Sequence, residues 1–280
     1  MKKFVASMVA VAGLAAAAQA QVGTSHMTIE VSADGVTWGS SADVQPGAVA
    51  HVRYRISLDG TQAMGLSGLN MQPTFGGWDN TGAGAFVDAL MAFADTGSNS
   101  TTPAGGVTDA SGDYGRILPF AAPNVTTTNR LRGHLSGSTM RVAQNGTTNN
   151  IGVGSASNNV NGSGGVPVSQ SGGFFAPPPT FQFGTENVLF LKLGVRVSED
   201  VPATDRLIQC DAPAGGFSLY GPTGSQVRAA NWLTGYSGSG SPTTNYAPVV
   251  VHGATIRVVP TPASLALLGL GGLVAGRRRR

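Results

Sequence analysis

The chain has 280 residues, of which 41 are glycine and only 11% are charged. This composition, together with the lack of long helical periodicity, argues against a helical protein. Basic residues number 17 and acidic residues 14, but two of the basic residues are Lys2 and Lys3 and four end the chain. The body, residues 21–276, therefore has a formal net charge of −3. Such a body offers no basic footprint for nucleic acid, which we exclude as a partner.

The N-terminus has the pattern of a secretory signal peptide. Lys2 and Lys3 precede an uncharged apolar run, and Ala18 and Ala20 flank Gln19 in a small-x-small cleavage site before Gln21. The alternative is a membrane anchor, but the run is shorter than the roughly 20 apolar residues that a spanning helix needs. The pattern predicts that residues 1–20 are removed and that the mature chain begins at Gln21.

The first part of the body predicts a hairpin followed by a half-buried strand. Residues 27–39, MTIEVSADGVTWG, indicate two strands joined by a type I′ turn at Asp34-Gly35. The next segment alternates apolar and polar residues with the period of a strand. Its predicted inner residues are Val52, Tyr54, Ile56 and Leu58, and its predicted outer residues are His51, Arg53, Arg55 and Ser57.

The segment DVQPGAVAHVRYRISL, residues 43–58, is followed by MGLSGLNMQPTF. Together they resemble the opening of cohesin-like and other extracellular β-sandwich modules, which often place Pro-Gly before an alternating strand. The resemblance covers roughly 30 residues and implies an architecture but no function.

Residues 109–115, DASGDYG, have the alternating oxygen ligands of a calcium loop at their first, third and fifth positions. Tyr114 stands where the sharp turn needs glycine, and Phe120 stands where a bidentate glutamate is needed. We therefore interpret the motif as a polar turn.

The next segment, residues 144–173, is rich in glycine, asparagine and serine and has little apolar surface to offset its ordering entropy. It predicts a long flexible surface loop. A repeat array is the alternative, but the segment shows no fixed period.

Two later segments predict further strands. In residues 186–200 the odd-numbered positions from Leu189 to Val197 are apolar, and Val188 and Phe190 make the other face partly apolar, which favours a central strand. VVVHGATIRVVP, residues 249–260, predicts a closing pair of short strands. We expect an all-β fold, a single β-sandwich or jelly-roll-like domain over residues 21–258.

Residues suited to chemistry are scattered along the chain. Cys210 is the one cysteine and alternates with polar neighbours, so we interpret it as a buried strand residue and not as a nucleophile or an intermolecular bridge. The histidines lack metal-ligand spacing, and each is expected to be a strand or loop residue. They are His26, His51, His134 and His252. No catalytic set, metal site or cofactor is predicted, so we expect no enzyme.

Three tryptophans are expected to lie in the core or at its rim, namely Trp38, Trp78 and Trp232. The alternative is a sugar-binding platform, which requires these side chains to be exposed in a row. A secreted hydrolase would instead need two carboxylates facing each other across a cleft, about 5–10 Å apart.

The C-terminus, residues 259–280, has three parts in order: Pro260-Thr261-Pro262, an apolar run, and the cluster Arg277, Arg278, Arg279 and Arg280. The run from Ala263 to Ala275 would form a hydrophobic helix of about 20 Å, short of the roughly 30 Å hydrocarbon core. Terminal arginines would stay on the cytoplasmic side of a membrane. We therefore expect a temporary membrane hold.

This order of parts resembles the PEP-CTERM protein-sorting signal, with Thr261 in place of the family's central glutamate. The resemblance implies processing by exosortase, a membrane-embedded cysteine transpeptidase-like enzyme, as the partner. Its bearers are exported bacterial proteins, often associated with exopolysaccharide. We expect an exported cell-surface or extracellular-matrix protein of structural or adhesive type. The alternative is a secreted carbohydrate-binding module associated with exopolysaccharide.

The intact mass of the protein extracted from the cell surface tests both ends at once. We expect a chain that begins at Gln21 and has lost its four terminal arginines, because each end carries a processing pattern. A mass that includes Lys2 and Lys3 would contradict the signal peptide. Retention of the arginines in the membrane fraction would show a permanent anchor.

Overall fold

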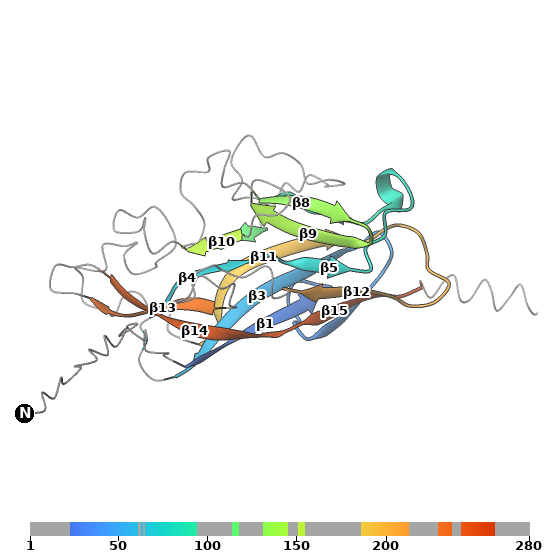
Figure 1. Cartoon of the computed structure of the whole chain (residues 1–280). Coiled ribbons are helices and arrows are strands. Elements are labelled where there is room, and N and C mark those ends of the chain that lie inside the picture. The colour runs from blue at the N-terminus through green and yellow to red at the C-terminus, as the bar shows by residue number, and fades with distance from the viewer. Residues whose placement is uncertain are drawn as a thin grey trace, which may run out of the picture.

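The computed structural model describes residues 23–60, 63, 65–93, 114–117, 131–144, 151–154, 186–212, 229–236 and 242–260. Within these residues the regular elements are strands and one short 3-10 helix, η1 (Gly84–Phe86). The strands form two sheets (Figure 1). The expected all-β sandwich is confirmed.

The larger sheet has nine strands in the order β10-β4-β13-β14-β1-β3-β11-β6, with β7 also paired to β11. In chain order they are β1 (Thr24–Ser32), β3 (Val49–Asp59), β4 (Gly65–Met71), β6 (Ala89–Leu90), β7 (Gly115–Arg116), β10 (Ile151–Gly154), β11 (Val188–Arg196), β13 (Ala229–Tyr236) and β14 (Pro242–His252).

The smaller sheet has six strands in the order β2-β15-β12-β5-β9-β8. In chain order they are β2 (Ser41–Val44), β5 (Thr74–Gly76), β8 (Leu131–Ser136), β9 (Thr139–Gln144), β12 (Arg206–Asp211) and β15 (Ala254–Val258).

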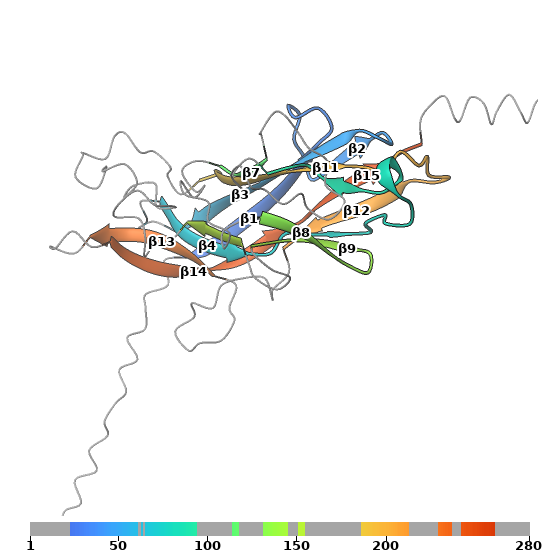
Figure 2. The ribbon, with the colours of Figure 1, turned by 90° about the horizontal axis from the view of Figure 1, so that it is seen from above.

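At two points the chain passes from one sheet to the other through a linker of one or two residues. β14 of the larger sheet is separated from β15 of the smaller sheet by Gly253 alone, and only Gln72 and Pro73 lie between β4 and β5. The β13–β14 hairpin lies at one end of the molecule, whereas β12 and β15 lie toward the other (Figures 1 and 2). The β14–β15 segment therefore runs along the length of the sandwich.

Apolar side chains from both sheets form one core between them. Trp232, Tyr54, Phe75 and Phe190 are among its largest fully buried side chains. The Trp232 ring N–H is satisfied inside this core, because Nε1 donates a hydrogen bond to Ser25 Oγ at 2.8 Å. A buried tryptophan is favourable only when its N–H finds such a partner.

The alternation predicted around residues 49–59 is confirmed in β3, where burial switches at every residue. β11 is flanked by strands on both sides, as expected of a central strand. A bulge between Leu189 and Leu191 shifts the register, so Leu189 lies half-buried outside the core while Leu191 and Phe190 are buried. The expected single face from Leu189 to Val197 is therefore wrong at its first residue.

Three other predictions need correction. The expected hairpin over 27–39 closes through a single bridge, Val31 with Gly39, after which the chain enters the smaller sheet as β2. Residues 151–154, expected in the long loop, form β10 because the buried Ile151 pairs with Met71 of β4. The closing strands β14 and β15 belong to different sheets, and β14 is longer than expected. Gln144, the first residue of the expected loop, ends β9, and residues 145–150 and 155–173 lie outside the described residues.

A buried carboxylate, Asp88, joins the ends of three strands. Both of its oxygens accept hydrogen bonds from the Arg206 guanidinium, at 2.6 and 2.7 Å, at the start of β12. Its oxygens also accept hydrogen bonds from the backbone N–H of Asp79, beyond β5, and of Ser198, beyond β11. The side chain of Asp88 is inaccessible to solvent, so the charge depends on these donors.

Replacing Asp88 with alanine should lower the free energy of unfolding by about 3 kcal/mol, because Arg206 and two backbone donors lose their acceptor. Urea denaturation followed by circular dichroism measures this change. The control is Asp43→Ala, which breaks the Arg257 pair, about half exposed at both side chains. An exposed pair contributes below about 1 kcal/mol. Equal losses in the two variants would contradict the role assigned to Asp88.

Candidate binding surface

The loop after β1 is held in shape by one aspartate. Asp34 Oδ1 accepts hydrogen bonds from the backbone N–H of Thr37 at 2.7 Å and of Val36 at 2.8 Å, and from Ser32 Oγ at 2.8 Å. Hydrogen bonds from the Thr37 and Val36 backbone hold the pKa of the Asp34 carboxyl well below its usual range. Gly35 alone has a positive φ of 73°, so the expected type I′ turn, which needs two such residues, is replaced by an aspartate-capped loop.

This loop places Trp38 over the outer face of the larger sheet. The Arg53 guanidinium lies 4.2 Å from the centroid of the Trp38 ring, a cation–π contact. Arg53 Nε also donates to Glu30 Oε2 at 2.6 Å, and Arg55 Nε lies 3.4 Å from the same oxygen. One carboxylate is thus shared by two guanidinium groups beside a half-buried indole.

A third cation belongs to this surface. Lys192 of β11 is the register partner of Arg53, which in turn is opposite Glu30 of β1. We call Arg53, Arg55 and Lys192 the basic strip. The side chains of Arg53 and Arg55 are 17% and 28% exposed, and Glu30 is the acidic residue that pairs with both. The strip therefore has more positive than negative charge although the body as a whole is slightly acidic.

A shallow hollow of about 220 Å³ adjoins the strip and is lined by Trp38, Asp34, Thr37 and Ser41, among others. It is smaller than the roughly 300–1,000 Å³ of most small-molecule sites. Its size suits one edge of a larger molecule lying across the surface, with the indole and two hydroxyl groups at its wall.

Tyr114 covers the part of the same outer face next to the strip, at His51, two residues before Arg53 on β3. Its hydroxyl lies 2.8 Å from His51 Nδ1, and the two rings stack at 5.9 Å between centroids. This close approach requires Gly194, because a Cβ there would lie 2.5 Å from Tyr114 Cζ. Tyr114, the sixth residue of the calcium-like motif, is a buried aromatic residue in the structure. Asp109, Ser111 and Asp113 lie outside the described residues.

The tryptophans do not form the exposed row that a sugar-binding platform requires. Trp232 is fully buried and Trp78 is 3% exposed, and Trp78 packs against Phe75. Trp38 is half-buried and lies under Arg53. The expectation of core or rim positions is confirmed for all three.

Cys210 is 1% exposed, and burial raises the pKa of its thiol far above the usual range, so it has the environment of a core residue. The histidines lie in strands, as expected, but His26 and His252 are brought together although they are 226 positions apart in sequence. That pairing depends on the parallel register of β1 and β14, which leaves no local signal in the sequence.

Most residues of the expected processing signals lie outside the described residues. These are Ala18, Ala20, Gln21, Thr261, Pro262 and Arg277 to Arg280. Pro260 is described and is half-buried just beyond β15. In the described part of the chain no helix has the length and apolarity to cross a membrane.

No family model matches the chain, and no curated protein matches it. Among solved structures it is similar to the sixth cohesin of scaffoldin B from Acetivibrio cellulolyticus, solved with a Cel5 dockerin. The identity is 10%, with 84% of this chain and 99% of that one covered, at a TM-score of 0.35.

It is also similar to the OlpA cohesin of Clostridium thermocellum, at 8% identity, 85% and 100% coverage and a TM-score of 0.33. A third similar structure is BcpA, the major pilin subunit of Bacillus cereus. The identity is 7%, with 84% of this chain and 40% of that one covered, at a TM-score of 0.27. TM-scores this low do not establish a shared fold, so the architecture rests on the strand pairing described above.

Replacing Arg53 with alanine should uncover the Trp38 ring and increase quenching of tryptophan fluorescence by acrylamide. Trp78 and Trp232 are buried, so the change reports on Trp38. The matched control is Lys192→Ala, which removes a neighbouring charge and keeps the Arg53 contact with the ring. Equal quenching in the wild type and the Arg53 variant would contradict the stacked arrangement.

Proposed function

We propose that this chain is an exported, non-catalytic surface protein of adhesive type, which binds an acidic matrix polysaccharide through the basic strip and the neighbouring Trp38. The observation that carries the proposal is the arrangement of Arg53, Arg55 and Lys192 on adjacent strands next to a half-buried indole. A C-terminal sorting signal processed by an exosortase-like enzyme would hold the protein at the cell surface during export.

The chemistry of the strip supports an acidic polymer. Guanidinium groups bind carboxylates through paired hydrogen bonds, and a lysine adds charge with less geometric demand. The Trp38 indole presents a flat apolar face of the kind that packs on a sugar ring. Glu30 neutralises part of the charge and orients Arg53, which keeps the strip ordered.

The path of the last strands supports attachment at one end. β14 and β15 together cover residues 242–258, which spans roughly 50 Å at the rise of an extended strand. The tail follows β15, which lies toward the end of the sandwich opposite the β13–β14 hairpin (Figure 1). A body tethered there would leave its side faces, including the basic strip, open to a ligand.

Cosedimentation of the mature protein with polygalacturonate, an acidic polysaccharide, tests the ligand class. We expect binding that weakens in 0.5 M salt, because ions screen the exposed charges. The double variant Arg55→Ala/Lys192→Ala should bind on the order of 100-fold more weakly, since each of the two charge-assisted contacts contributes about 1.5 kcal/mol.

Two controls make this test specific. Neutral dextran should bind far less than polygalacturonate. Arg257→Ala, which removes an exposed arginine from the smaller sheet, should leave binding unchanged. Equal binding of both polysaccharides, or full binding by the double variant, would overturn the proposed ligand.

A further inference from the structure

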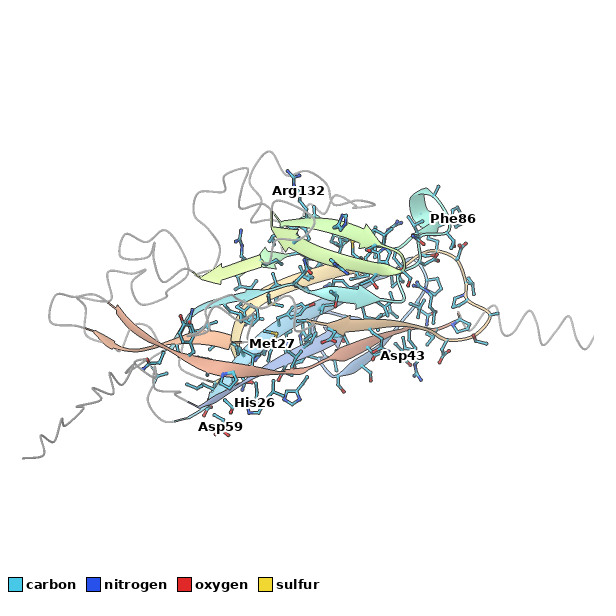
Figure 3. All side chains as sticks on the ribbon, viewed as in Figure 1. His26, Met27, Asp43, Asp59, Phe86 and Arg132 are labelled. Carbon is cyan, nitrogen blue, oxygen red and sulfur yellow. The ribbon has the colours of Figure 1, made fainter. Side chains whose placement is uncertain are left out.

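His26 and His252 face each other on the outer surface of the larger sheet. β1 and β14 pair in parallel, with Thr28 opposite His252 and Val250 opposite His26. This diagonal arrangement brings His26 Nδ1 to 3.3 Å from His252 Nε2, with the rings 5.6 Å apart and 16° from parallel. Figure 3 shows His26 pointing away from the body, whereas its neighbour Met27 is fully buried in the core.

The spacing of the two nitrogens matches the bite of a tetrahedral metal ion. Two ligands at about 2.05 Å from zinc, separated by the tetrahedral angle, lie about 3.3–3.4 Å apart. A square-planar copper ion with adjacent ligands at a similar distance would require about 2.8 Å. The 3.3 Å separation of the two nitrogens, which is also that of a hydrogen bond between the rings, is therefore compatible with a zinc ion.

The surroundings leave room for the rest of a coordination shell. His252 is exposed and His26 is half-buried, so water can reach both rings. The described residues hold no group of three or more possible metal ligands, so water would fill the other positions. Arg55 lies opposite Thr28 on β3, but its Nε is 3.4 Å from the Glu30 carboxylate, which offsets part of its charge.

We propose that His26 and His252 form a surface site for a zinc ion, with two imidazole ligands and water. The ion would connect the first strand of the body to the strand that leads toward the tail, β14. The site requires the folded sheet, because the two histidines are far apart in the chain, so zinc binding should stabilise the native state. This inference does not depend on the proposed polysaccharide ligand.

Calorimetric titration of the mature protein with zinc chloride, in a buffer that does not chelate, tests the site. We expect one ion per chain and a higher melting temperature when zinc is in excess. His26→Ala and His252→Ala should each weaken binding at least about tenfold, because the second ligand acts intramolecularly. The double variant should be little worse than either single variant, as expected of two ligands to one ion.

The matched control is His134→Ala, which removes a histidine from β8 of the smaller sheet and should change zinc affinity less than twofold. Circular dichroism of each variant checks that the fold is kept. Tetrahedral cobalt absorption in the wild type, lost in both His26 and His252 variants, would support the geometry. Zinc affinity equal in wild type and both single variants, or lost equally in the His134 variant, would overturn the proposal.

Discussion

The Asp88 carboxylate connects the two sheets of this protein at the end of the sandwich where β15 finishes. It has no access to solvent and takes four hydrogen bonds, from a guanidinium on β12 and from the backbone beyond β5 and β11. Because β11 belongs to the larger sheet and β5 and β12 to the smaller, these bonds fix how the two layers meet. A buried charge is tolerated only with such complete pairing, so the local geometry has little freedom.

The two sheets are also joined by strands whose backbone continues from one sheet into the other. β4 continues into β5, and β14 continues into β15, so the backbone itself joins the layers at several points. At the second junction Gly253 is needed, since a Cβ there would lie 2.9 Å from the Cys210 carbonyl oxygen. The apolar core and these covalent crossings together give one domain with a long axis along β14 and β15.

The outer face of the larger sheet carries both proposed sites, and each is held by backbone register. The basic strip exists because β11, β3 and β1 are neighbours, which aligns Lys192, Arg53 and Glu30 in one row. The histidine pair exists because β1 is also paired with β14. A rigid sheet can order such side chains at low entropic cost, whereas a loop would have to be ordered on binding.

Much of the strand content could be predicted from the sequence, because a half-buried strand shows its period directly. The alternation from His51 to Leu58 gave the correct inner and outer faces of β3, and Cys210 was correctly expected in the core. Prediction was wrong where local chemistry overrode the pattern. The Asp34 carboxylate caps the backbone of Thr37 and widens the expected turn, and the bulge after Leu189 moves that residue off the inner face.

The sequence by itself determined which residues favour strands, which face of each strand is apolar, and the patterns at the two ends of the chain. Those properties depend on neighbours in sequence, so a single chain displays them. Only the tertiary structure decided the partners: Arg206 for Asp88, Arg53 for Trp38, and His252 for His26. Each of these contacts depends on strand order and register between distant segments, and the sum of many weak cross-strand interactions sets that register.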